Sequence, residues 1–170
     1  MTDLLRRIGW VILAALAVFL VTVPAAAQES AEGDSVRWNF YAGAFDIIDS
    51  DKAIEAGFEH RFEPFTLWRQ TFVPMAGIAA TDEESVWAYA GLRWELSLGR
   101  WVVAPNFAAS LYEDGDGKDL GGVIEFRSGL EVARRLQNGS RVGLLFYHLS
   151  NARIYELNPG SESLVLSWSW

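Results

Sequence analysis

Three residues near the carboxyl end of the chain carry side chains that ester hydrolysis can use. His148 and Ser150 lie two positions apart in an alternating apolar segment, and Glu162 lies near the start of the next segment. In a serine esterase an imidazole accepts the proton of the nucleophilic hydroxyl, and a carboxylate orients that imidazole. A His and a Ser at this spacing also occur without any catalytic role, so their meaning depends on the segments that position them.

Those segments have the period of β-strands. From Val36 onward apolar residues recur at every second position, and turn residues separate the runs. Most runs exceed the five or six residues typical of soluble strands and reach the roughly 9 to 11 that cross a bilayer. We predict eight strands, over residues 36–48, 52–62, 67–80, 85–98, 101–113, 120–136, 140–154 and 161–170.

Each predicted strand has one apolar face and one face of mixed charge. This pattern predicts an all-β fold, an eight-stranded antiparallel transmembrane barrel of the outer membrane, whose apolar face meets lipid. A barrel of eight strands is just wide enough for side chains to fill, which argues against a pore. We expect interior ion pairs among Glu55, Glu59, Glu95, Glu125, Glu131, Arg37, Arg61, Arg93 and Arg127. A periplasmic ligand-binding barrel with a soluble exterior is an alternative.

Tryptophans and connections orient the predicted barrel. Five tryptophans fall at the periplasmic strand ends and form an aromatic girdle there, namely Trp38, Trp68, Trp101, Trp168 and Trp170. The predicted outer connections have about three to six residues each and include the two longest, as expected for outer-membrane barrels. His148, Ser150 and Glu162 lie together at the outer end, on the lipid-facing side. Polar residues near the headgroups cost only about 0 to 1 kcal/mol, so this patch does not by itself require catalysis.

The remainder of the chain limits its class and destination. Arg6 and Arg7, an apolar run and Ala25–Ala27 have the form of a secretory signal, which we predict to cover residues 1–27 and to be cleaved. Residues 28–35 form a polar lead, and residues 36–170 form the barrel. The net charge of -8 argues against a nucleic-acid binder. The absence of cysteine excludes thiol chemistry, and the 114–119 run lacks EF-hand spacing, so we expect no metal and no cofactor.

The final hairpin resembles a known enzyme family. The stretch Tyr147-His148-Leu149-Ser150-Asn151-Ala152 is followed by Asn158-Pro159-Gly160-Ser161-Glu162, with Glu162 twelve positions after Ser150. This is similar to the signature of the PagL-type lipid A 3-O-deacylases, also grouped as acyloxyacyl hydrolases. In that family a His-x-Ser-Asn-Ala motif precedes an Asn-x-Gly turn and a Glu. The terminal aromatic residue, Trp170, resembles the assembly signal of outer-membrane barrels.

The resemblance implies a function and assigns roles. It implies hydrolysis of the ester-linked acyl chain at position 3 of lipid A, the lipid of lipopolysaccharide, in the outer leaflet. Ser150 would be the nucleophile, His148 the general base and Glu162 the orienting carboxylate, while Asn151 matches the Asn associated with the oxyanion site. A homodimer stays open. The alternative from another class is a structural or adhesive outer-membrane barrel without catalysis.

Overall fold

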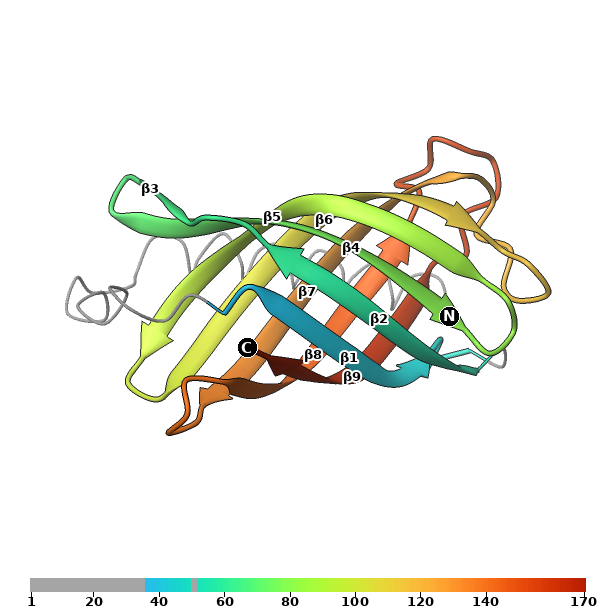
Figure 1. The fold of residues 1–170 in the computed structure, drawn as a ribbon. Coiled ribbons are helices and arrows are strands. Elements are labelled where there is room, and N and C mark those ends of the chain that lie inside the picture. The colour runs from blue at the N-terminus through green and yellow to red at the C-terminus, as the bar shows by residue number, and fades with distance from the viewer. Residues whose placement is uncertain (1–35, 50–51) are drawn as a thin grey trace.

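The protein is built from strands that wind around a single axis (Figure 1). A computed structural model describes residues 36–49 and 52–170. The predicted signal (1–27) and polar lead (28–35) lie outside the described residues. In that described part the strands are β1 (Trp38–Phe45), β2 (Ala53–Arg61), β3 (Phe65–Leu67), β4 (Gln70–Thr81), β5 (Val86–Leu98), β6 (Trp101–Glu113), β7 (Ile124–Arg135), β8 (Arg141–Ser150) and β9 (Ser161–Ser169).

Eight of these strands close into a barrel, as predicted. All pairings are antiparallel, β1 pairs with β9, and β2 closes the barrel by pairing with β4 across residues 55–61 and 75–81. The short strand β3 pairs only with β4 and extends the sheet at one end. Closure satisfies the edge hydrogen bonds of the sheet, which a barrel in lipid requires.

The third predicted strand, 67–80, is wrong at its start. The chain turns at Trp68 and Arg69, which have φ values of 49° and 64°, and this turn separates β3 from β4. Trp68 is 86% exposed at the tip of the hairpin and does not open a strand. The other four tryptophans of the predicted girdle lie at or beside the ends of β1, β6 and β9. Neither Trp68 nor Arg69 is a typical turn residue, and for this reason the sequence does not reveal the turn.

Two of the outer connections are longer than the three to six residues expected, whereas the β4–β5 connection, residues 82–85, has the four residues predicted. The β6–β7 connection covers residues 114–123 and the β8–β9 connection residues 151–160. Leu120 was predicted to begin a strand, but it is 1% exposed within the first of these connections. Figure 1 shows both connections at one end of the barrel, opposite the end that carries β3.

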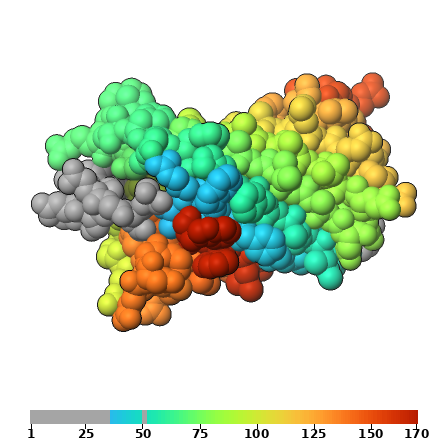
Figure 2. All heavy atoms as spheres, viewed as in Figure 1, coloured from blue at the N-terminus to red at the C-terminus, as the bar shows by residue number. Residues whose placement is uncertain are grey.

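The barrel surface is apolar around its middle. Apolar residues at alternate positions of the strands are exposed, as in Ile54, Phe107, Leu111 and Leu166. Figure 2 shows side chains of neighbouring strands packed side by side on one face of the molecule. Among residues 36–49 and 52–170, no helix has the length and apolar character needed to cross a membrane.

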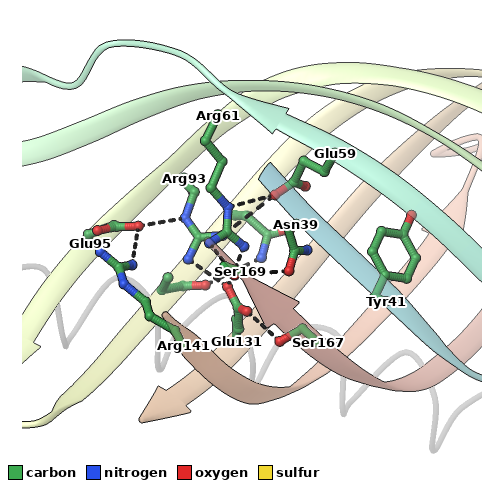
Figure 3. Close-up of polar contacts among 12 residues, drawn as sticks. Asn39, Tyr41, Glu59, Arg61, Arg93, Glu95, Glu131, Arg141, Ser167 and Ser169 are labelled. Atoms are coloured by element: carbon green, nitrogen blue, oxygen red, sulfur yellow. Dashed lines mark hydrogen bonds and ion pairs between the residues drawn. The ribbon is translucent and has the colours of Figure 1, made fainter. Parts of the chain in front are cut away.

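The interior holds ion pairs, as the alternation predicts. Arg61 donates to Glu59 and Glu131, and Arg93 contacts Glu131 at 2.6 Å; all four side chains are buried (Figure 3). Arg141, which the sequence analysis did not include, pairs with Glu95 at 2.9 Å. This network links β2, β5, β7 and β8 toward the end of the barrel that carries β3.

Four of the predicted interior residues do not form the expected ion pairs. Glu125 is fully buried and forms no ion pair with the other described residues. Arg37 precedes β1 and pairs with the exposed Glu63, which follows β2. Glu55 accepts hydrogen bonds from Tyr147 and Ser163, at 2.6 and 2.7 Å. Arg127 lies over the rings of three tyrosines, Tyr41, Tyr89 and Tyr147. Most of the charged residues predicted to lie inside the barrel are therefore buried. Alternation does not predict which residue each of them contacts.

Candidate active site

His148 and Glu162 are direct cross-strand neighbours. The antiparallel register of β8 and β9 places His148 opposite Glu162, and the Nδ1 of the ring lies 3.0 Å from Oε1 of the carboxylate. The Glu162 side chain is 12% exposed and that of His148 is 38% exposed. A carboxylate on Nδ1 favours the tautomer in which Nδ1–H donates to it, leaving Nε2 free to accept a proton.

Ser150 is the last residue of β8 and shares the outward face with His148. It is half-buried and lies opposite Phe126 of β7. In an extended strand the Cα atoms of His148 and Ser150 are roughly 6.6 to 6.8 Å apart, and side chains that lean along the strand can close this gap. In the described part of the chain no hydrogen bond joins the Ser150 hydroxyl to the His148 ring. Such bonds are often long in substrate-free enzymes and shorten when substrate binds.

Gly160 packs against the imidazole from the β8–β9 connection. Its φ is +71°, and a Cβ built there would lie 2.7 Å from Cε1 of His148. Glycine is therefore required here both by the backbone and by the space left for the ring. The close approach confines the imidazole between this backbone and Glu162. In the sequence Gly160 is recognisable only as part of the Asn-x-Gly turn, and its contact with His148 depends on a connection whose path alternation does not predict.

Asn151 organises the connections beside the nucleophile. Its side chain is fully buried, and its Nδ2 donates to the carbonyls of Leu120 and Leu157, at 2.7 and 2.8 Å. Its Oδ1 accepts the backbone N–H of Arg153, and its own backbone N–H donates to Oδ1 of Asn158. Both amide hydrogens are thus engaged, so donation to an oxyanion would require one of these bonds to break. The oxyanion role of Asn151 stays a prediction.

The backbone directly after Asn151 is strained. Ala152 and Arg153 have φ values of 52° and 67°, which side chains other than Gly, Asn and Asp rarely adopt. The bond from Ile154 N–H to the Asn151 carbonyl, at 3.0 Å, closes this turn. Strain of this kind costs on the order of 1 to 3 kcal/mol per residue and persists where surrounding contacts fix it. Nothing in the residue types at positions 152 and 153 indicates it beforehand.

Charged side chains under the outer connections lie close to Glu162. The carboxylate of Asp46 is buried and pairs with Lys118, whose Nζ lies 2.8 Å from its Oδ1. Burial raises the pKa of Asp46 above its usual range, and Lys118 opposes that rise. Among the described residues, no group of three or more His, Cys, Asp or Glu side chains is arranged to hold a metal ion.

The fold of this chain has a similar counterpart among solved structures. The fold is similar to that in a crystal structure described as the outer membrane enzyme PagL, with a TM-score of 0.59 and 19% sequence identity. That match covers 78% of this chain and 97% of the other. A comparison with curated proteins found no match.

The family model described as lipid A 3-O-deacylase (PagL) matches residues 52–170. This segment holds the whole final hairpin and all barrel strands except β1. Since the match extends over well more than half of the 170 residues, the chain belongs to the PagL family of lipid A 3-O-deacylases, which are hydrolases.

Proposed function

We propose that this protein is an outer-membrane esterase that removes the 3-O-linked acyl chain of lipid A by a Ser-His-Glu mechanism. The observation that carries the proposal is the contact between His148 and Glu162 on the lipid-facing surface, two residues from Ser150. A carboxylate-supported imidazole beside a serine is the arrangement that activates a hydroxyl. Membership of the family supports the choice of lipid A as substrate.

In the proposed reaction, Ser150 Oγ attacks the carbonyl carbon of the ester and His148 Nε2 accepts the hydroxyl proton. Glu162 holds Nδ1–H and stabilises the imidazolium. As the tetrahedral intermediate collapses, His148 gives the proton to the departing oxygen at position 3 of the sugar. Water, deprotonated by His148, then cleaves the acyl-serine, which releases the fatty acid and restores the Ser150 hydroxyl. These steps balance without a metal or cofactor.

The position of the three residues suits a lipid substrate. They lie on the outside of the barrel, where an ester in the outer leaflet reaches them by lateral diffusion. The interior is filled by ion pairs and aromatic side chains, which supports a surface reaction over transport. One chain supplies all three side chains, so we propose that no partner subunit is needed. Export through a cleaved signal at residues 1–27 is part of this proposal.

Asn151 has a supporting role in this mechanism. We expect Asn151→Ala to reduce turnover, because the carbonyls of Leu120 and Leu157 lose their shared donor beside Ser150.

The test is mass spectrometry of lipid A from a Gram-negative host that expresses the protein. Wild type should remove one hydroxyacyl chain, and Ser150→Ala should leave lipid A intact. A matched control is Ser128→Ala, which alters a serine on the neighbouring strand β7 that lies opposite His148 and has been assigned no role in the reaction; it should retain hydrolysis. Unchanged lipid A in the presence of folded wild-type barrel would contradict the proposal and favour a non-catalytic structural or adhesive barrel.

A further inference from the structure

A lysine outside the final hairpin is buried at the outer end of the barrel. Lys118 lies in the β6–β7 connection and is 8% exposed. Its Nζ lies 2.8 Å from Oδ1 of Asp46 and 2.9 Å from Oδ2 of Asp49, both in the β1–β2 connection. In the barrel order, β9 and β8 separate β1 from β7. The lysine therefore ties together two connections whose strands are not neighbours.

Asp46 links this ion pair to Glu162. Asp46 follows β1 directly, is fully buried and has a φ of 54°. The next residue, Ile47, donates its backbone N–H to the carbonyl of Glu162 at 2.8 Å. A fixed Asp46 therefore also fixes the hydrogen bond from Ile47 to Glu162, the residue that orients His148.

The same segment also reaches the other side of the candidate site. The carbonyl of Leu120, two residues after Lys118, accepts a hydrogen bond from Asn151, the neighbour of Ser150. The carbonyl of Lys118 itself accepts the hydroxyl of Tyr112 at 2.8 Å, which anchors the segment to β6. Residues 118–120 therefore contact Asp46, whose sequence neighbour Ile47 bonds to Glu162, and Asn151, whose sequence neighbour is Ser150.

We propose that Lys118 is a positioning residue for the esterase site, and this inference rests on the proposed function. Its ammonium compensates the buried Asp46 carboxylate, and Asp46 in turn holds the backbone at Glu162. The charged groups around Asp46 are Lys118, Asp49 and Glu162, so Lys118 is the cation among three carboxylates. Without it, Asp46 would have no cationic partner and would take up a proton or leave its buried position, and Ile47 would be held less firmly at Glu162.

The test compares three variants in the full-length folded protein. Lys118→Met removes the charge and keeps most of the side-chain volume. Lys52→Met is the matched control, because Lys52 is the other lysine of the chain and is exposed at the same end. Asp46→Asn combined with Lys118→Met removes both charges, and asparagine tolerates a positive φ.

We expect Lys118→Met to lower kcat by about tenfold to a hundredfold with little change in KM, since misplaced catalytic groups lose activity on that scale. Lys52→Met should match wild type, and the double variant should recover most of the lost kcat. Wild-type kcat in Lys118→Met would overturn the inference. A double variant as impaired as the single one would also overturn it, because the loss would then reflect packing and not charge.

A second measurement separates this inference from the proposed function. The chain has two histidines, His60 and His148, so isotope-labelled histidine gives ring signals that His60→Gln assigns. The His148 signal should move in Lys118→Met and return in the double variant. Wild-type protein that hydrolyses no lipid A would refute the function alone, and a His148 signal unmoved by Lys118→Met would refute the positioning role.

Discussion

At the scale of single residues, the contact between His148 and Glu162 predicts an unequal division of labour. His148→Ala should abolish lipid A hydrolysis as fully as Ser150→Ala, because the hydroxyl then has no base. Glu162→Gln should retain roughly tenfold to a hundredfold more activity than His148→Ala or Ser150→Ala. The carboxylate orients His148 and so contributes only part of the rate enhancement of the three side chains. Single-turnover release of fatty acid by the three purified variants measures this order. Robust hydrolysis by His148→Ala would remove histidine from the mechanism.

Gly160 offers a second prediction at this scale. Gly160→Ala places a methyl group 2.7 Å from Cε1 of His148, so the ring must move and turnover should fall. Gly139→Ala is the control, because its φ is +83° but a Cβ there meets nothing within 4 Å. Both changes should cost on the order of 1 to 2 kcal/mol of stability, but only the first should reduce kcat. Equal activity in the two variants would contradict a positional role for Gly160.

At the scale of elements, the outer connections are held together by charge as well as by hydrogen bonds. Burial alone would lower the pKa of Lys118, but the hydrogen bonds and charges of Asp46 and Asp49 raise it above its ordinary value of 10.5. A raised lysine pKa stabilises the folded state fully below the unfolded value, and this contribution is lost as the pH rises through the folded value. As the pH rises from neutral, the connections should therefore loosen only in strongly alkaline solution.

This pH dependence is measurable as a difference between two proteins. The urea midpoint of wild type should exceed that of Lys118→Met by a constant amount from neutral pH up to about pH 10.5 and then converge with it. The folded fraction can be read from the heat-modifiable band in gel electrophoresis. A difference that already disappears near neutral pH would show that Lys118 is not held as a charged partner of Asp46.

Prediction from sequence succeeded where the period of two applies and failed where the chain turns. Residues 101–113 form β6 as predicted, and alternation places His148 and Glu162 on one face, where the structure joins them. The turn at Trp68 and Arg69 was missed because neither residue type favours a positive φ. The contacts of Lys118 and Asn151 were missed because they join connections that are distant in sequence, and no local pattern encodes such pairs.

At the scale of the whole molecule, a charged side chain inside the barrel should contribute more to the free energy of unfolding than a charged side chain on the surface. Glu131 accepts hydrogen bonds from Arg61, Arg93 and Ser167 inside the barrel. Glu131→Ala leaves two buried guanidinium groups short of a partner and should lower the free energy of unfolding by about 3 to 5 kcal/mol. Glu63→Ala removes an exposed carboxylate paired with Arg37 and should cost at most about 1 kcal/mol. Urea titration of both variants in detergent measures the contrast, and equal losses would contradict a structural role for the interior network.

The most direct test of the proposed mechanism is to locate the nucleophile chemically. The folded protein is treated with a serine-reactive fluorophosphonate, digested and sequenced by tandem mass spectrometry. Because a phosphonate is captured only by an activated hydroxyl, we expect the label on Ser150 in wild type and a strong reduction of labelling in His148→Ala. A label on another serine, or labelling of Ser150 that is unchanged in His148→Ala, would contradict the assignment of Ser150 and His148 as nucleophile and base.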